Sequence, residues 1–217
     1  MSVVASIQAR MGSTRLPGKV LLSLGGRRVI GWVVWRCAAA EHVDELRVTT
    51  GRGPENGVIT EWCRRAGHDS LTGPEEDLLE RHRAVAEATH ADVLVRVTGD
   101  CPFVPAEEID RVVAEHRANG AGYTTNHTDR MPVGTAVDVI DVDLLDELAD
   151  LGDTHPVVRL RENPDSWNVR FTDSDDWAAF RTAHVAVDTP DDYWSLADAV
   201  DAVGSDPVAV ARWMAND

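Results

Sequence analysis

Residues 3–19 read VVASIQARMGSTRLPGK, and the remaining chain is interpreted outward from them. The stretch starts as a short apolar run rich in β-branched residues, which is typical of a buried strand. It then becomes a loop with two glycines, a proline and small hydroxyl side chains, and an apolar pattern with helical spacing follows over 28–40. The order strand, glycine-containing loop and helix predicts a phosphate-binding loop.

The loop is rich in positive charge. Arg10, Arg15 and Lys19 lie within ten residues, and Lys19 is the only lysine in the chain. Because a flexible ammonium beside a glycine can reach a phosphate oxygen, we interpret the loop as one that binds a nucleotide. The alternative is a polar surface turn, but three cations in a chain of net charge −16 favour an anion site. Neither G-x-x-x-x-G-K-[ST] nor G-x-G-x-x-G is present.

Composition limits the class of protein. The 217 residues suit one α/β domain over 1–217. Lys+Arg number 21 against 37 Asp+Glu, which disfavours a surface for nucleic acid or for an anionic membrane. Three widely spaced cysteines indicate neither a disulfide framework nor a zinc site. Without a signal-peptide pattern or a membrane-spanning apolar run, we expect a soluble, cytoplasmic protein.

Hydrophobic periodicity predicts alternating strands and helices, and therefore a Rossmann-like, mostly parallel sheet flanked by helices. Residues 91–98 are almost continuously apolar or β-branched, as in a buried central strand. From residue 123 onward the alternation predicts a small antiparallel excursion in the C-terminal half. We expect strands at 3–8, 45–50, 91–98, 123–126, 135–140, 167–172 and 182–188, and helices at 28–40, 58–66, 78–89, 105–117, 142–149, 154–161, 193–203 and 206–215.

Two carboxylates follow predicted strands. Asp100 comes after 91–98, and Asp188 ends 182–188. Ligands in open α/β sheets bind outside the carboxyl ends of the strands, so both side chains could hold Mg²⁺ against a bound phosphate while Arg15 and Lys19 neutralise charge there. The alternatives are a turn residue for Asp100 and a helix cap for Asp188. With the cationic loop, the set predicts nucleotidyl transfer, with Arg15, Lys19 and Asp100 as catalytic residues.

Four motifs carry a resemblance to a known family: IQARMGSTRLPGK at 7–19, GPEEDLLER at 73–81, ADVLVRVTGDCP at 91–102 and VDTPDD at 187–192. In this order the chain resembles the cytidylyltransferases of spore coat polysaccharide biosynthesis, and those acting on 3-deoxy-manno-octulosonate (KDO) and acylneuraminate. The resemblance implies a GT-A-like nucleotidyltransferase fold and Mg²⁺ held by Asp100 and Asp188. It also implies nucleotide-binding positions, which we place at Gln8, Ala9, Arg10, Met11, Gly12, Ser13, Arg15, Lys19, Arg81 and Thr98.

The implied reaction transfers CMP from CTP to a sugar acid or related acceptor and releases pyrophosphate, in surface polysaccharide or glycan biosynthesis. A homodimer is also implied. Residues 132–134 and Asp138 match the family's acceptor region in outline, whereas Ala136 and Val137 leave fewer polar groups for a sugar acid. Three alternatives stay open: a GT-A-type glycosyltransferase, a nucleotidyltransferase for a sugar phosphate or cofactor, and a non-catalytic nucleotide-binding homologue.

Other conspicuous residues receive structural interpretations. His127 and His155 could contact an acceptor, but the eight histidines show no ligand spacing, and we expect both to lie on the surface. Cys101 has no base placed near it by the sequence and is interpreted as a small buried residue. Trp32 and Trp35 are assigned to packing on a core helix.

Overall fold

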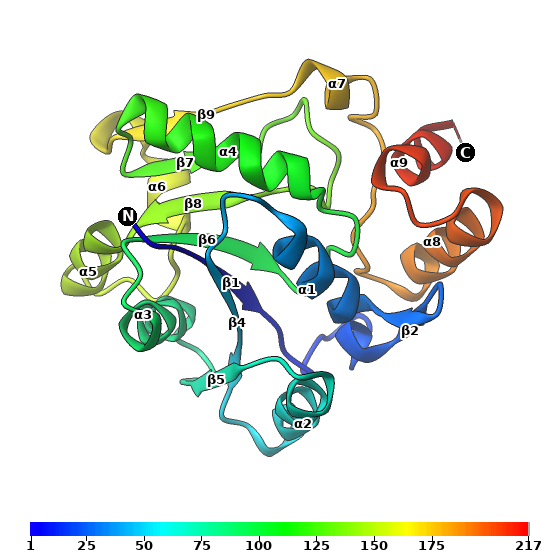
Figure 1. The fold of residues 1–217 in the computed structure, drawn as a ribbon, viewed down its shortest axis with the longest axis horizontal. Helices are drawn as coiled ribbons and strands as arrows, with labels where there is room; N and C mark the ends of the chain where they lie inside the picture. The colour runs from blue at the N-terminus through cyan, green and yellow to red at the C-terminus, as the bar shows by residue number, and fades with distance from the viewer. Residues whose placement is uncertain (217) are drawn as a thin grey trace.

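The computed structural model describes residues 1–216, which are built around a seven-stranded sheet (Figure 1). The strand order is β5-β4-β1-β6-β8-β7-β9. A separate two-stranded hairpin is made of β2 (Ser23–Leu24) and β3 (Arg27–Arg28). The strands of the main sheet are β1 (Val3–Gln8), β4 (Glu45–Gly51), β5 (Ser70–Gly73), β6 (Val93–Thr98), β7 (Tyr123–Thr125), β8 (Asp138–Asp141) and β9 (Val169–Phe171).

The sheet is parallel from β5 to β6 and then changes direction. β1 pairs in parallel with both β4 and β6, whereas β8 runs antiparallel to β6 and to β7. β9 returns parallel to β7. This arrangement confirms the predicted mostly parallel sheet with an antiparallel excursion. Because β1 and β6 are parallel neighbours, the loops after Gln8 and Thr98 leave the same edge of the sheet.

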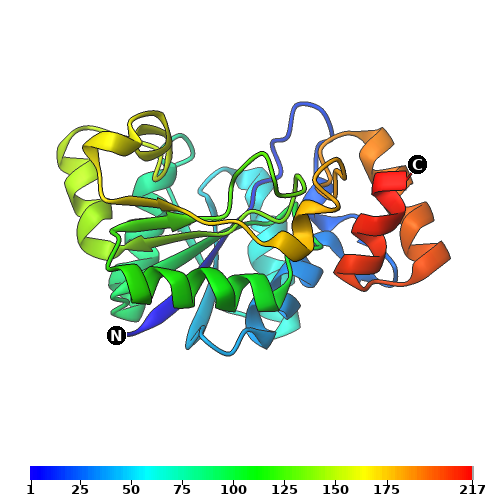
Figure 2. The same cartoon turned by 90° about the horizontal axis from the view of Figure 1, so that it is seen from above.

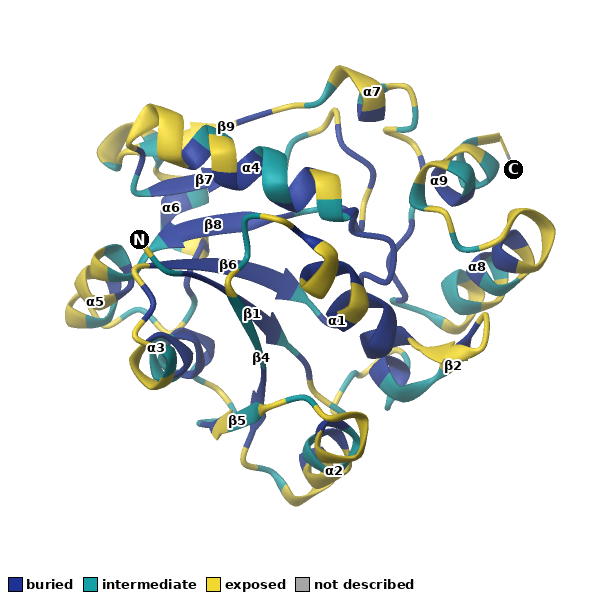
Figure 3. Ribbon diagram, in the orientation of Figure 1, coloured by how far each residue is buried: buried dark blue, intermediate teal, exposed yellow. Residues whose placement is uncertain are grey.

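Helices cover both faces of the sheet (Figure 2). The alternation of β1 side chains separates two cores: Val3, Ala5 and Ile7 pack with residues of α1, α2 and α4, while Val4 packs with α3, α5 and α6. Colouring by burial shows that the central strands β1, β6 and β8 are largely buried between these layers (Figure 3). The helices are α1 (Val29–Ala39), α2 (Gly57–Ala66), α3 (Leu78–Thr89), α4 (Ala106–Asn119), α5 (Val142–Asp150), α6 (Val158–Glu162), α7 (Asp175–Ala178), α8 (Pro190–Val203) and α9 (Pro207–Asn216).

A third apolar cluster lies at the end of the molecule opposite α5 and α6 (Figures 1 and 2). It joins α8 and α9 to Trp32 of α1, to Phe103, and to Val185 and Val187 in the segment before α8. The cluster therefore anchors the segment that carries Asp188. Among residues 1–216, no helix combines the length and the apolar character that crossing a bilayer requires.

Three predicted features differ from the structure. Residues 182–188 do not form a strand; they run past residue 133 with a single bridge between Val133 and His184, because β6 already has a neighbour on each side. The predicted helix 154–161 is shorter and later, at Val158–Glu162, since residues 154–157 form a turn whose Thr154 carbonyl accepts a hydrogen bond from the Leu79 amide. Trp35 packs edge-on against Trp32, as predicted, but it is 48% exposed and lies outside the buried core.

The predicted domain, 1–217, includes Asp217, which lies outside the described residues. The other predicted elements are present with shifted ends. The largest shift is in the strand predicted over 135–140, which spans Asp138–Asp141. Its earlier residues instead form part of the connection between β7 and β8.

Candidate active site

The loop after β1 is closed by its own backbone. The amides of Ser13 and Gly18 both donate to the Met11 carbonyl, at 2.9 and 3.0 Å. Gly18 has φ +73°, a left-handed conformation that glycine adopts without steric cost, and it leads directly into Lys19. The Met11 amide donates to Asn56 Oδ1 at 2.9 Å, which ties the loop to the start of α2. The local sequence thus fixes the direction in which Lys19 leaves the loop.

The two predicted carboxylates converge on Lys19. Its Nζ atom lies 2.5 Å from Asp100 Oδ2 and 2.8 Å from Asp188 Oδ1. Arg15 Nη2 contacts the same Asp188 oxygen at 3.0 Å. The Val187 amide donates to the Asp100 carbonyl at 2.9 Å, so one backbone hydrogen bond joins the segments that carry the two carboxylates. The structure therefore brings Arg15, Lys19, Asp100 and Asp188 together.

Asp188 is not a helix cap. Thr189 caps α8 in a capping box with Asp192, and Asp188 Oδ1 instead faces Lys19 and Arg15. Burial by itself would raise the pKa of Asp188, but Lys19 and Arg15 outweigh it and the pKa lies below its ordinary value. Burial would likewise lower the pKa of Lys19, yet Asp100 and Asp188 keep it above its ordinary value. Asp188 and Lys19 are therefore both charged at neutral pH.

A cleft of about 410 Å³ lies beside this cluster. Arg81, from α3, is only 6% exposed, and its Nε atom has no hydrogen-bond partner among residues 1–216. A buried unpaired donor in a cleft wall is costly unless a ligand satisfies it. The cleft is lined by the predicted residues Gln8, Ala9, Arg10, Ser13, Arg15, Lys19, Arg81 and Thr98, and also by Glu75, Thr154 and His155. Met11 and Gly12 do not line it, and Met11 instead organises the loop.

A second cavity of about 300 Å³ adjoins the first and shares Thr98, Asp100 and Asp188 with it. The residues common to both cavities are those around the two carboxylates, so a group bound in either cavity would meet them. The walls of the second cavity include Arg96, Arg161, residues 131–134 and Ala186. The arrangement is that of two compartments with one charged junction.

A buried carboxylate organises the wall of the second cavity. Asp138, on β8, is 1% exposed and pairs with Arg96 Nη1 at 2.5 Å and with Arg161 Nη2 at 2.6 Å. It also accepts from Tyr123 Oη and Thr125 Oγ1 at 2.6 and 2.8 Å. The Asp138 carboxylate compensates part of the positive charge of the two arginines. Burial by itself would raise the pKa of Asp138, but the two arginines outweigh it and hold the pKa well below its usual range.

The network continues toward the loop after β1. Arg96 Nε donates to Gln8 Oε1 at 2.8 Å, at the end of β1. His82 of α3 contacts the same Gln8 oxygen at 3.3 Å and Ser6 Oγ at 2.7 Å. Gln8 therefore lies between the loop and the wall of the second cavity, and it links the two compartments.

His155 corrects one expectation. It is half-buried in the wall of the first cleft and does not lie on the outer surface. Burial, together with the positive charge of Arg96 and Arg161, lowers its pKa to about 4. His127 is exposed, as predicted, and lies at the rim of the second cavity. Cys101 is buried, as predicted, and burial raises its pKa above the ordinary range.

His82 and His155 predict that the folded protein loses stability in acid. Burial lowers the pKa of His82 well below 6.5, as it lowers that of His155. Because the unfolded chain takes up protons near pH 6.5 while the native imidazoles stay neutral, the free energy of unfolding should decrease as the pH falls from 6.5 toward 4, by about 1.4 kcal/mol per pH unit for each proton. Urea denaturation between pH 8 and pH 5 measures this slope.

Two variants test whether His82 causes this dependence of the unfolding free energy on pH. His82→Asn should flatten the slope, whereas His90→Asn removes an exposed imidazole and should leave it unchanged. Equal slopes for the wild type and His82→Asn would contradict a neutral, buried His82.

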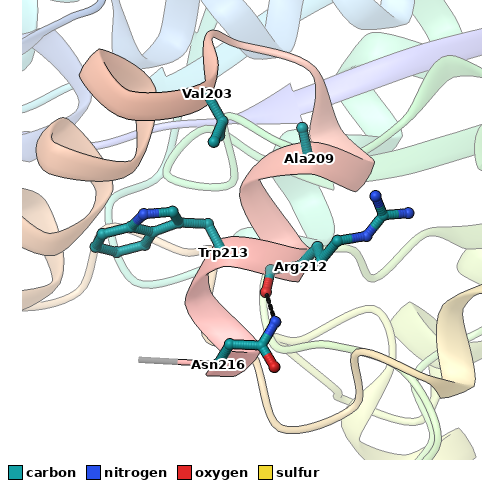
Figure 4. A pocket seen from close by; sticks show the side chains of 5 residues that line it. All are labelled: Val203, Ala209, Arg212, Trp213 and Asn216. Atoms are coloured by element: carbon teal, nitrogen blue, oxygen red, sulfur yellow. Dashed lines mark hydrogen bonds between the residues drawn. The ribbon is translucent and has the colours of Figure 1, made fainter.

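Two further features do not compete with this site. Ligand atoms of His184, Asp188 and Asp192 lie within 4.8 Å of one another. However, Asp192 Oδ2 already accepts from the Thr189 amide and hydroxyl at 2.7 and 2.8 Å, which leaves it poorly available to a metal. A pocket of about 400 Å³ at α8 and α9 is lined, among the residues that the structure describes, by Val203, Ala209, Arg212, Trp213 and Asn216, and none of these five side chains is a carboxylate or an imidazole (Figure 4).

Comparisons with known proteins identify the family and the fold of the chain. The family described as Cytidylyltransferase matches residues 4–195. The spore coat polysaccharide biosynthesis protein SpsF of Bacillus subtilis (strain 168) is 31% identical over 211 residues, covering 93% of this chain and 87% of the relative. A cytidylyltransferase structure from Leptospira borgpetersenii has a TM-score of 0.89 at 24% identity, over 100% of this chain and 98% of that one. A CMP:2-keto-3-deoxy-manno-octonic acid synthetase complexed with CTP has a TM-score of 0.74 at 20% identity, over 93% of this chain and 99% of that one. The two structures confirm the predicted fold.

Proposed function

The chain belongs to the cytidylyltransferase family and is a nucleotidyltransferase, and we propose that it transfers CMP from CTP to a sugar acid or a related acceptor in polysaccharide or glycan biosynthesis. The observation that carries the proposal is the convergence of Lys19, Asp100 and Asp188 where the two cavities meet. In this reaction an acceptor hydroxyl oxygen attacks the α-phosphorus, the bond from that phosphorus to the oxygen bridging to the β-phosphate breaks, pyrophosphate leaves, and the hydroxyl proton is released to solvent. The junction is the place where such a transfer needs positive charge.

We assign CTP to the first cleft. Arg10, Arg15 and Lys19 are the cations for the triphosphate, because they line the cleft on one loop. Arg81 lines the same cleft, and we assign it to the base or ribose because of the resemblance to the cytidylyltransferase family. A bound nucleotide would neutralise the cationic loop. Replacement of the loop cations or of Arg81 should therefore weaken CTP binding.

Asp100 and Asp188 fit a divalent cation. Each offers hard carboxylate oxygens, which Mg²⁺ prefers, and the place between them already holds a cationic group, the Lys19 ammonium. When bound, Mg²⁺ would supply positive charge to the phosphate oxygens at the α-phosphorus. The protein's own part is positioning: the hydrogen bond between the Val187 amide and the Asp100 carbonyl holds the two carboxylates at one junction.

We assign the acceptor to the second cavity. Arg96 and Arg161 use two donors each on Asp138, Gln8 and Tyr123. Arg96 Nη2 and Arg161 Nη1 make no hydrogen bond within residues 1–216 and are not buried there without a partner. Free guanidinium donors in a cavity wall favour an anionic group on the acceptor, which supports a sugar acid. The polar side chains missing at Ala136 and Val137 are thus replaced by arginines from other elements.

Replacement of Arg161 tests the acceptor assignment. In Arg161→Met, we expect KM for a productive sugar acid to rise about 10–100-fold, because a hydrogen bond to a charged group contributes about 1.5–3 kcal/mol. KM for CTP should change much less. The control is Arg159→Met on the same helix, where Arg159 pairs with Asp153 outside both cavities. Equal KM values for the acceptor in both variants would remove Arg161 from the acceptor site.

The function itself is tested in two steps. Thermal melting with each of the four nucleoside triphosphates and Mg²⁺ or Mn²⁺ should show the largest stabilisation with CTP, about 2.7 kcal/mol at a hundredfold excess over Kd. Pyrophosphate release is then measured with CTP and a set of sugar acids and neutral sugars. Glycosyl transfer without pyrophosphate, or a larger stabilisation by another nucleotide, would contradict the proposal. Binding of CTP without turnover of any acceptor would favour a non-catalytic homologue.

A further inference from the structure

We propose that Lys19 occupies the divalent-cation position in the nucleotide-free protein, and that the phosphates of the nucleotide draw it away so that the cation enters together with CTP. This inference rests on the proposed function, because it uses the same two carboxylates. It adds an order of binding: the protein without nucleotide should bind the cation poorly. It also gives Lys19 two positions, one between the carboxylates and one at the triphosphate.

The contacts leave no room for ammonium and cation together. Lys19 Nζ lies 2.5 Å from Asp100 Oδ2 and 2.8 Å from Asp188 Oδ1, and these oxygens face the junction. The other Asp188 oxygen faces His184 at 3.5 Å, and Asp100 Oδ1 is 3.7 Å from Cys101 Sγ. Mg²⁺ binds oxygens at about 2.0–2.1 Å, closer than the ammonium does. A cation bound by both inward-facing oxygens must therefore displace Lys19.

The charges of the cluster also indicate that a divalent cation must displace Lys19. Arg15 and Lys19 compensate Asp100 and Asp188, so the cluster is balanced without a metal. A doubly charged ion added beside a fixed ammonium would be strongly repelled in a place where the Lys19 side chain is only 10% exposed. Removing the ammonium restores an attractive pair of carboxylates.

Lys19 has a second place to go. It stands at the end of the loop that lines the first cleft with Arg10 and Arg15, where we assign the triphosphate. A lysine ammonium sits on a flexible four-carbon stem, whereas the backbone before it is fixed by Gly18. The side chain can thus change partners while the loop keeps its shape. CTP would supply phosphate oxygens in exchange for the two carboxylates.

Metal binding without nucleotide provides the first test. Free Mn²⁺ is measured by electron paramagnetic resonance in titrations of the wild type, Lys19→Met, Arg15→Met and Arg65→Met. Arg65 lies exposed on α2 and controls for net charge, while Arg15 contacts Asp188 alone among the two carboxylates. We expect Lys19→Met to bind one Mn²⁺ at least about tenfold more tightly than wild type, with a smaller gain for Arg15→Met and none for Arg65→Met.

The outcomes are decisive in either direction. Unchanged or weaker Mn²⁺ binding by Lys19→Met would overturn the proposal, as would an equal gain in Arg65→Met, which would indicate net charge alone. Loss of the gained affinity in Lys19→Met with Asp188→Asn would place the ion at the junction. Because nucleotide is absent, these results are independent of CTP turnover, which tests the proposed function separately.

A second measurement avoids any variant. Lys19 is the only lysine, so protein made with lysine labelled with ¹³C at Cε gives a single side-chain signal. We expect that signal to move when CTP is added in the absence of metal, and to stay unchanged with millimolar Mg²⁺ alone. A signal unchanged at saturating CTP would overturn the proposal, because Lys19 would then have kept its carboxylate partners.

Discussion

Replacement of Asp100 by asparagine is expected to lower kcat for CMP transfer by about 10²–10³-fold, the range that the loss of one preorganised charge-stabilising group costs. The amide keeps the shape of the side chain but removes the charge that would hold the divalent cation. Asp100 is also the carboxylate nearest to Lys19, at 2.5 Å. The measurement is steady-state pyrophosphate release with CTP over a range of Mn²⁺ and Mg²⁺ concentrations, which separates a lost metal site from a lost acceptor site.

Two controls belong with that measurement. Asp146→Asn removes an exposed carboxylate on α5 whose partner within residues 1–216 is Arg83, and it should keep full activity. Asp188→Asn should resemble Asp100→Asn, since both carboxylates face the same junction. Thermal melting confirms that each variant is folded. Turnover of Asp100→Asn within tenfold of wild type would show that this carboxylate does not hold the cation.

The sequence predicted the parts of the site that depend on short-range order. The loop of residues 10–19 is recognisable because its glycines and cations lie together, and Gly18 indeed adopts a positive φ. Asp100 could be placed because a buried strand precedes it and parallel strands end at a common edge. These inferences need only the strand before each loop. They do not need the partner of any side chain.

Asp188 was placed near Asp100 for a partly wrong reason. The prediction assumed a strand over 182–188, but these residues form an irregular segment with a single bridge from His184 to Val133. Alternate apolar side chains of this segment, Ala183, Val185 and Val187, pack into the cluster with α8 and α9. Their alternation in the sequence is the same as that of a strand. Hydrophobic alternation reports burial, and it cannot distinguish a hydrogen-bonded strand from an extended segment buried by helices.

Arg96 and Arg161 could not be found by local patterns. Arg96 interrupts an otherwise apolar strand, which is a signal, because a charge in a buried strand needs a partner. That partner, Asp138, is distant in sequence and becomes a neighbour only through the antiparallel pairing of β6 with β8, where Arg96 lies opposite Asp138. Arg161 comes from a helix on the far side of a long connection. Only the tertiary structure shows that the three groups form one wall.

Loss of the Asp138 carboxylate is expected to destabilise the protein by about 3–5 kcal/mol, because breaking a buried ion pair leaves its partners uncompensated. Asp138→Asn would deprive Arg96 and Arg161 of their shared counter-charge. Urea denaturation at pH 7 measures the loss. Asp141→Asn, on the same strand but 43% exposed, should cost far less. A loss below about 1 kcal/mol would show that water or the arginines themselves relieve the charge.

The pH dependence of that difference supplies a further check on Asp138. Its folded pKa lies below the ordinary 3.8, because Arg96 and Arg161 outweigh the burial that would otherwise raise it. A group with a depressed folded pKa stabilises the native state above its unfolded pKa, and this contribution is lost as the pH falls toward the folded value. The gap between wild type and Asp138→Asn should therefore be constant from pH 7 to pH 5 and should narrow below about pH 4. A gap that stays constant in acid would mean that the carboxylate charge contributes nothing, and the loss would then come from packing or hydrogen-bond geometry alone.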